Sequence, residues 1–241
     1  MTDDTLLQQI AAKKAELDRL RLQAPHGLDN LNQSHDIELT YTSNAIEGNT
    51  LSLKETALVL QGLTIDKKPI KDHLEAIQHR DAFYAVCDMV SKKVKLDESV
   101  IKQIHSIILN DMPVDRGIYR RVAVRILGAI HLPPNPVKIP DLMSELLTWY
   151  KKSRENLIKK TAIFHIQFER IHPFIDGNGR TGRLITNLEL MKGGYPPIDI
   201  KFSDRHEYYD CFNEFEQTEK IERLFAEYVL ERIEEYLRII E

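Results

Sequence analysis

The stretch that decides the fold runs from His172 to Arg183 and reads HPFIDGNGRTGR. It combines one imidazole, one carboxylate, three glycines and two guanidinium groups. Apolar residues at helical spacing precede it, among them Phe164, Phe168 and Ile171, and a similar pattern resumes after it. The sequence therefore predicts two helices joined by a polar loop that carries more chemistry than a structural turn requires.

His172 is the candidate general base of this loop. Pro173 disfavours the α conformation at the residue before it, so we expect the incoming helix, 161–171, to end at His172. Backbone carbonyls at that helix end favour a protonated imidazole by roughly 0.3–1 kcal/mol. A neutral histidine in this position is therefore helped to accept a proton.

The outgoing helix should begin within residues 177–180, and these residues are typical of an anion site. Gly177 and Gly179 allow positive φ and let consecutive N–H groups turn towards one point, where the free donors of the first helical turn add to them. Arg180 and Arg183 lie three residues apart on one helical face. Both guanidinium groups can therefore reach the same bound phosphates.

Asp176 is the acid of the loop. A carboxylate beside so much positive charge is best explained if it holds a divalent cation that bridges phosphate oxygens, and we expect Mg²⁺, with Mn²⁺ as a substitute. A second metal assignment would use His165 and His172 as ligands. Their seven-residue gap, with no Cys and no H-E-x-x-H pattern, makes this assignment weak.

A dinucleotide site is an alternative function for the loop. Residues 177–182 satisfy the dinucleotide fingerprint G-x-G-x-x-G, and Asp199 lies at about the required distance downstream. That fingerprint needs a preceding strand, whereas a helix and a proline precede this one. A purely structural role is the second alternative. A glycine-rich turn beside a core histidine and surface arginines would explain each residue alone, but not all of them together.

The loop resembles the Fic-domain signature H-x-F-x-[D/E]-G-N-G-R-x-x-R. The matching residues are His172, Phe174, Asp176, Gly177, Asn178, Gly179, Arg180 and Arg183. The likeness covers roughly residues 39–215 and implies an all-α, Fic-type helical bundle with a small β-hairpin flap. It implies a protein adenylyltransferase, which moves AMP from ATP to a Ser, Thr or Tyr hydroxyl of a target protein.

The resemblance also implies site roles. His172 would be the catalytic residue and Asp176 the metal ligand. The ATP-binding residues would be Asp176, Gly177, Asn178, Gly179, Arg180, Thr181, Gly182, Arg183 and Tyr208. In similar proteins an asparagine further along the Tyr208 helix contributes to the adenine pocket, whereas the aligned residue here is Glu216.

A second stretch, 41–49, reads YTSNAIEGN and predicts a short helical segment closed by Gly48. An acid in the last turn of a helix opposes the dipole, so Glu47 needs a cationic partner. Ser43, Glu47 and Gly48 resemble the Fic inhibitory motif [S/T]-x-x-x-E-[G/N]. That likeness implies that Glu47 pairs with Arg183 and restrains the enzyme, as in the class whose inhibitory helix is N-terminal.

Residues 119–127 form a β-like run before a proline-rich stretch. The family resemblance implies a β-hairpin flap at about 119–134, which would hold the target segment by strand-like main-chain pairing. The positions assigned to this pairing are Gly128, Ala129, Ile130 and His131.

Three regions follow from these assignments. Residues 1–38 form an N-terminal helical region, and 217–241 form an acidic C-terminal helix for which a homodimer contact is one available role. Between them, 39–216 form the Fic core, with the inhibitory helix at about 42–48, the flap at about 119–134 and the active-site loop at 172–183.

Composition limits the class of protein. A chain of 241 residues, 42% hydrophobic, can bury one substantial core. A net charge of −4 gives no reason to expect nucleic acid, and no basic run suggests a membrane surface. Cys87 and Cys211 lack metal spacing and fit a reducing compartment. With no signal peptide or apolar span in view, we expect a cytoplasmic protein.

Related activities stay open on the sequence alone. The same loop could remove AMP from a modified target, with Glu47 positioning a water molecule. Some similar proteins transfer phosphocholine, UMP or phosphate instead. A non-enzymatic alternative is a Fic-like adaptor that binds ATP and modifies nothing.

Overall fold

The computed structural model describes residues 4–23, 29–126, 131–213 and 215–240, and within these ranges the chain is helical with no strand. The α-helices are α1 (Asp4–Gln23), α2 (Asp29–Ile46), α3 (Leu53–Leu60), α4 (Ile70–Ser91), α5 (Glu98–Ile108), α6 (Ile139–Lys152), α7 (Leu157–Ile171), α8 (Asn178–Lys192), α9 (Arg205–Asp210) and α10 (Glu219–Ile240). Two short 3₁₀ helices are η1 (Pro136–Lys138) and η2 (Phe202–Asp204). The all-α prediction is confirmed.

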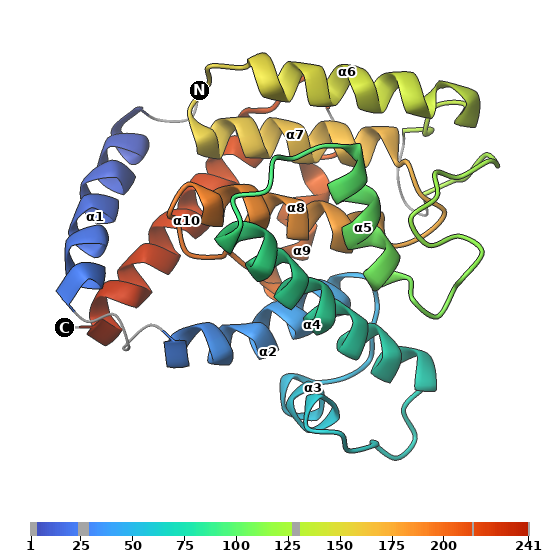
Figure 1. Cartoon of the computed structure of the whole chain (residues 1–241), viewed down its shortest axis with the longest axis horizontal. Coiled ribbons are helices and arrows are strands. Elements are labelled where there is room, and N and C mark those ends of the chain that lie inside the picture. The colour runs from blue at the N-terminus through green and yellow to red at the C-terminus, as the bar shows by residue number, and fades with distance from the viewer. Residues whose placement is uncertain (1–3, 24–28, 127–130, 214, 241) are drawn as a thin grey trace.

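Helix α8 lies in the middle of the molecule, with α7 alongside it (Figure 1). Two apolar clusters meet at this pair. One joins α7 and α8 to α4, α5 and α6, and the other joins them to α1, α9 and α10. Helix α7 supplies Phe164 and Phe168 to the first cluster and Ile158 and Ile166 to the second. Because α7 and α8 are covered on both sides, the loop between them is held at both ends by packed core.

The N-terminal end of α8 faces α2, α4 and α5, which come from distant parts of the chain. Helix α2 continues across the boundary predicted at residue 38, because its segments on either side form one helix, Asp29–Ile46. The final helix, α10, packs against α1 and α7. None of the described helices is long and apolar enough to cross a membrane.

The β-hairpin predicted at about 119–134 is not seen in the described parts of that segment, 119–126 and 131–134. The reason lies in the hydrogen bonds of Arg120. Its backbone N–H bonds to the carbonyl of Pro173, outside the segment, and its side chain bonds to Val122 in one arm and Pro134 in the other. A buried side chain therefore joins the arms where a strand ladder was expected. Gly128, Ala129 and Ile130 lie outside the described residues.

Candidate active site

His172 closes the C-terminus of α7 in the left-handed conformation, with φ 49° and ψ 62°. Its backbone N–H still bonds to the carbonyl of Phe168 at 2.9 Å, so the helix ends where Pro173 predicts. A non-glycine residue at positive φ is uncommon and is held only by its surroundings. Here it turns the chain sharply into the loop and keeps the imidazole against the protein.

The imidazole of His172 is neutral at neutral pH. Burial, followed by the positive charge of Arg120, lowers its pKa to about 4, although Glu47 acts in the opposite direction. The gain predicted from the helix C-terminus is therefore outweighed by desolvation. A neutral imidazole beside the loop is available to accept a proton.

The loop is shaped by Asn178 and Phe174. The Asn178 side chain accepts a hydrogen bond from the Phe174 N–H at 2.9 Å and donates one to the Phe174 carbonyl at 3.0 Å. The Phe174 ring is fully buried and stacks on His105 with 3.6 Å between ring centroids. Gly177 has φ +73°, and a methyl group there would lie 2.8 Å from Leu109. The loop geometry therefore requires these residues whether or not a ligand is bound.

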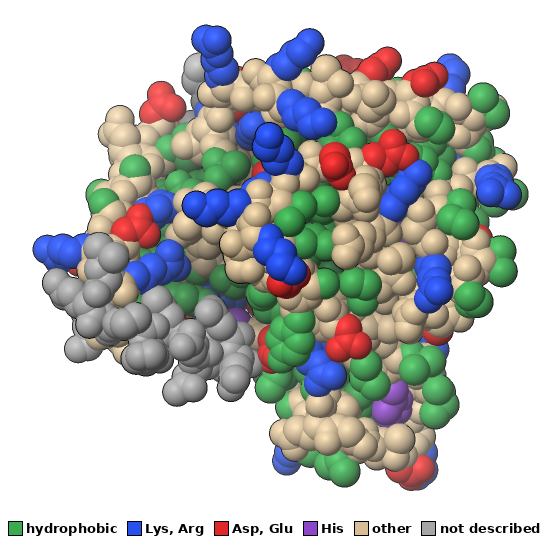
Figure 2. Space-filling view, in the orientation of Figure 1, with side chains coloured by type: hydrophobic (Ala, Val, Ile, Leu, Met, Phe, Trp, Pro, Cys, Tyr) green, Lys and Arg blue, Asp and Glu red, His purple; other side chains and the backbone are tan. Residues whose placement is uncertain are grey.

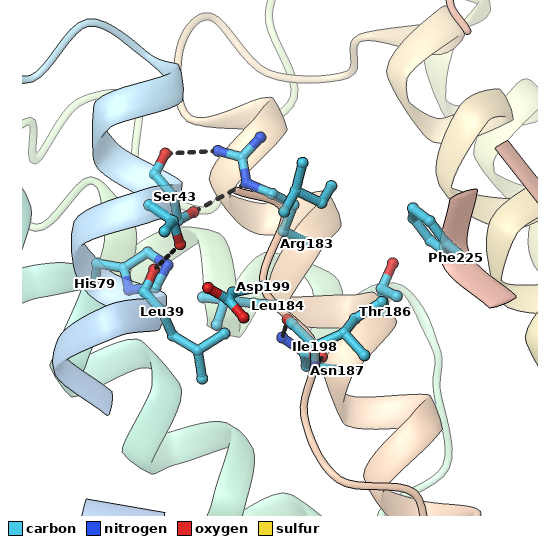
Figure 3. A pocket seen from close by; sticks show the side chains of 12 residues that line it. Leu39, Ser43, His79, Arg183, Leu184, Thr186, Asn187, Ile198, Asp199 and Phe225 are labelled. Carbon is cyan, nitrogen blue, oxygen red and sulfur yellow. Dashed lines mark hydrogen bonds between the residues drawn. The ribbon is translucent and has the colours of Figure 1, made fainter. Parts of the chain in front are cut away.

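Arg183 is held by α2. Its Nε donates to the Ser43 hydroxyl at 3.0 Å, and its Nη2 donates to the Ser43 carbonyl at 2.8 Å and to the Glu47 carboxylate at 2.7 Å. Figure 3 shows the guanidinium group directed at Ser43. Burial alone would lower the pKa of Arg183, but the charge of Glu47, aided by Tyr208, holds it above its ordinary value. The predicted pair of Glu47 and Arg183 is therefore formed.

The Glu47 carboxylate also covers the start of α8. A methyl group built on Gly179 would lie 2.1 Å from Glu47 Oε1 and 3.0 Å from Arg183 Nη1. The carboxylate thus rests against the glycine of the first helical turn, where free N–H groups attract an anion. Gly48, with φ +94°, ends the segment that brings Glu47 there.

Arg180 has two acidic partners. Its Nη1 lies 3.3 Å from Glu75 on α4, and its Nη2 lies 3.4 Å from Asp176 in the loop. Glu75 also accepts a hydrogen bond from Asn49 at 3.0 Å. Both arginines of the predicted phosphate site are therefore engaged by carboxylates, and Glu75 connects Arg180 to the residue after the inhibitory motif.

Arg120 is hydrogen-bonded to the main chain at His172. Its side chain is 4% exposed, and its hydrogen bonds go to main-chain carbonyls, among them His172 at 2.8 Å and Pro134 at 2.7 Å. The last carbonyls of a helix lack partners within the helix, so a buried guanidinium group in this place satisfies them and fixes the exit of α7. Arg120 is thus a positioning residue for His172.

Two substitutions of Arg120 should separate its effect on the position of His172 from its effect on the pKa of His172. For the AMP transfer expected from the sequence, Arg120→Lys and Arg120→Gln should lower kcat by about 10- to 100-fold, because a small displacement of a reacting group costs about that much. Arg120→Gln should also raise the pKa of His172 and move the acid limb of the pH–rate profile upward, whereas Arg120→Lys should leave the limb in place. Labelled-ATP kinetics between pH 4 and 9 measure both effects, with exposed Arg154→Gln as control. Equal profiles for the two variants would contradict the electrostatic effect.

Comparison with known proteins agrees with this geometry. A sequence model of the Fic/DOC family matches residues 95–190, which include the whole loop. The protein called "Protein adenylyltransferase Fic" from Culex quinquefasciatus is 35% identical over 219 residues, which is 86% of this chain and 43% of that protein. The protein of the same name from Nematostella vectensis is 37% identical over 180 residues, 72% of this chain and 42% of its own length.

The chain belongs to the Fic/DOC family. It spans less than half the length of these curated relatives. Among solved structures, a Fic-domain-containing signaling protein from Bacteroides thetaiotaomicron superposes with a TM-score of 0.88 at 25% identity, covering 98% of this chain and 96% of that one. Fic-1 from C. elegans gives a TM-score of 0.87 at 28% identity, covering 98% of this chain and 72% of that one.

The role of His105 in this Fic protein was not predicted from the sequence. Its position on a predicted helix is the same as that of an ordinary packed or solvated histidine. It is fully buried, and its Nδ1 accepts the Gly117 N–H at 2.9 Å. Its Nε2 therefore carries the proton and donates to the Asp176 carbonyl at 3.0 Å. Burial lowers its pKa to about 4, so the ring stays neutral. His105 thus ties the Fic loop to the segment that leads into the flap.

Glu169 was also missed. It lies on α7 with one carboxylate oxygen 3.9 Å from His172 Nδ1. Burial, with a further contribution from Glu47, raises its pKa to about 8, so it is protonated at pH 7. A methyl group on Gly182 would lie 2.7 Å from Glu169, which explains this glycine by the close packing of α7 on α8. Neither role could be read from residue type and spacing.

The remaining predicted residues lie around this centre. Tyr208 is 1% exposed, and its hydroxyl lies 2.7 Å from His165 Nε2 and 3.4 Å from Arg183 Nη1, so in this conformation it supports Arg183. Thr181 is fully buried in α8. His131 bonds through Nε2 to the Arg170 carbonyl at 3.1 Å, and its ring packs against Phe215.

Proposed function

We propose that this chain transfers AMP from ATP to a Ser, Thr or Tyr hydroxyl of a target protein and that Glu47 restrains it. The carboxylate of Glu47 on Gly179 and Arg183 is the observation that carries this function. A side-chain anion rests at a helix N-terminus between an arginine and glycines, which is the chemistry that would recognise a phosphate. The names of the curated relatives support AMP as the group transferred.

In this mechanism the phosphates of ATP lie over residues 177–179. Neutral His172 takes the proton from the target hydroxyl as its oxygen attacks the α-phosphorus. A new P–O bond forms to the target, the bond between the α-phosphorus and the bridging oxygen breaks, and pyrophosphate leaves. Arg180 and the loop N–H groups stabilise the developing charge, while Arg183, once free of Glu47, aligns the γ-phosphate.

Asp176 is the residue that would hold Mg²⁺, or Mn²⁺ in its place. Its carboxylate is 45% exposed, and its Oδ1 accepts the Gly177 N–H at 2.6 Å. The described residues contain no cluster of three His, Cys, Asp or Glu side chains suited to a metal. A single exposed carboxylate fits a Mg²⁺ ion that keeps several waters and binds together with a triphosphate. The ion would neutralise phosphate charge.

A candidate hollow for the nucleobase lies at the end of α7, where Arg170 lines it. A space of about 280 Å³ is lined by His131, Arg170, Asn213, Phe215, Glu216 and Gln217. Tyr208 would contribute to nucleotide binding through Arg183, which it contacts. Glu216 replaces the asparagine of similar proteins, so competition between ATP and other nucleotides measures its effect on selectivity.

Labelled ATP tests the transfer directly. The chain with Glu47→Gly is incubated with a cell extract and either α- or γ-labelled ATP. We expect the α label on protein and no γ label. Protein carrying the γ label would indicate phosphate transfer, and ATP binding without any labelled protein would indicate an adaptor. Mass spectrometry of the labelled bands identifies the target and the modified residue.

Removal of AMP is a second candidate because Glu47 keeps its carboxylate at the loop, where it can orient a water molecule. The Glu47 side chain is 34% exposed and influences the pKa of His172, so the two groups share one site. Incubation of a labelled, modified protein with the unaltered chain tests this activity. Loss of label with the unaltered chain, but not with Glu47→Gly, supports removal.

A further inference from the structure

The segment 116–138 has an unusual charge for this chain. It contains no Asp or Glu, whereas the whole chain has a net charge of −4. Its basic residues are Arg116, Arg120, Arg121, Arg125 and Lys138. These residues are spread along the segment and do not form a continuous basic run. Only the folded structure shows which of their side chains are exposed near one another.

Arg120 is buried and used by the active site, but the other basic residues of the segment are exposed. Neither Arg121 nor Arg125 has an ion pair within the described parts of the chain. Exposed apolar side chains lie among them, with Val122 56%, Leu132 68% and Val137 83% exposed. In Figure 2, hydrophobic and basic side chains mix along the right-hand edge, where Figure 1 places the connection from α5 to α6.

We call Arg121, Val122, Arg125, Leu132, Val137 and Lys138 the basic flap face. A groove of about 670 Å³ adjoins it, between α6 and α7. Leu132 and Lys138 belong to the basic flap face and also line the groove. Other lining residues, Leu142, Trp149 and Ile163, make the groove largely apolar. Apolar surface bordered by charge is typical of protein contacts rather than of a purely solvated loop.

The basic flap face is close to the reacting centre. Arg120, next to Arg121 in the chain, bonds to the His172 carbonyl, and His131, next to Leu132, bonds to the Arg170 carbonyl. The basic flap face therefore adjoins the end of α7 that carries His172, where a protein segment presenting a hydroxyl can contact it. Charges on that segment would lie within reach of Arg121 and Arg125.

We propose, on the basis of the transferase function proposed above, that the basic flap face and its groove dock an acidic segment of the target protein. Carboxylates near the modified residue pair with Arg121, Arg125 and Lys138, and an apolar side chain enters the groove beside Leu132 and Trp149. Complementary charge of this kind raises the association rate and selects among partners.

The phosphates of ATP do not account for these basic residues. Arg180, Arg183 and the N-terminus of α8 already form a separate anion site. Nucleic acid is less suited because the groove beside the face is largely apolar. These two ligands nevertheless make informative comparisons in the test.

Peptide binding tests docking without relying on catalysis. The probes are a fluorescent peptide with a central Thr flanked by valines and glutamates, a matched peptide with glutamine for every glutamate, and an oligothymidine of equal charge. Fluorescence anisotropy with the full chain should show about tenfold tighter binding of the acidic peptide than of the glutamine peptide, as expected for a few exposed ion pairs. Added salt should reduce the difference.

Variants decide whether the basic flap face is responsible. Arg121→Glu with Arg125→Glu should remove the preference, while the equal charge change Arg19→Glu with Lys95→Glu, at exposed sites on α1 and between α4 and α5, should keep it. Equal binding of both peptides, tighter binding of oligothymidine, or equal effects of the two variants would each overturn docking of an acidic segment.

A kinetic measurement separates this inference from the proposed transfer. In the Glu47→Gly background, Arg121→Glu with Arg125→Glu should leave the KM for ATP in self-modification unchanged. Absence of any labelled protein would refute the proposed transfer. The docking inference would then be judged by the peptide-binding measurement alone. A KM for ATP raised tenfold would instead assign these arginines to the nucleotide and overturn the docking role.

Discussion

His172→Ala should abolish AMP transfer, with a loss of about 10²–10⁴-fold, because the target hydroxyl loses its proton acceptor. The imidazole is neutral at pH 7, since burial and Arg120 lower its pKa to about 4. The same pKa predicts the pH dependence. Activity should be constant from pH 6 to 7, below the pKa of about 8 of the neighbouring Glu169, and fall as the pH approaches 4, where the His172 ring becomes protonated. Initial rates with α-labelled ATP measure both effects.

A second substitution at His172 controls for loss of the fold. His172 has φ 49°, which asparagine tolerates better than alanine, so His172→Asn removes the base and retains the backbone. His206→Ala, at an exposed histidine, should retain full activity. An active His172→Asn protein would remove His172 from the role of base, whereas an acid limb centred near pH 6.5 would contradict the lowered pKa of His172.

Local signals predicted the course of the chain around the loop. Pro173 set the end of α7, and Gly177 marked the left-handed residue before α8, because both act through their own φ and ψ. The all-α fold could likewise be predicted from periodic apolar residues and from the family signature. Conformational restrictions of this kind do not depend on the rest of the protein.

Contacts between distant helices were mostly not predictable. Glu75, Arg120 and His105 hold the arginine, the imidazole and the loop, yet each looks ordinary in its own segment. Their roles arise when α4, α5 and the flap arms pack around α8. The pairing of Glu47 with Arg183 was predicted only because the family motif connects them, since their separation in sequence carries no local signal.

The described arms of the predicted hairpin, 119–126 and 131–134, carry no strand for a related reason. Residues 119–127 have the composition of a strand, and composition favours strands only when a neighbouring strand accepts the hydrogen bonds. The N–H of Arg120 bonds instead to the carbonyl of Pro173 at 2.9 Å, within the loop 172–183. The buried Arg120 side chain also bonds to the carbonyls of His172, Val122 and Pro134, so the described part of this segment is tied to the loop rather than to a partner strand.

Glu47→Gly should raise self-modification by about 10- to 100-fold, the usual range for coupling between a regulatory contact and a site. The substitution removes the carboxylate from Arg183, where it lies at 2.7 Å, and from the surface of Gly179. Both changes open the place proposed for the γ-phosphate. Gel autoradiography with α-labelled ATP and titration of ATP affinity provide the measurements.

Two further variants identify which part of the Glu47 contact restrains transfer. Glu47→Gln removes the charge but keeps a side chain against Gly179, so it should give a smaller increase than Glu47→Gly if steric exclusion contributes. Arg183→Ala in the Glu47→Gly background should cancel the gain, because the proposed mechanism uses the freed guanidinium group to align the γ-phosphate. Unchanged self-modification in Glu47→Gly would refute restraint by Glu47. A gain that survives Arg183→Ala would show that the carboxylate acts by blocking Gly179 rather than by holding the arginine.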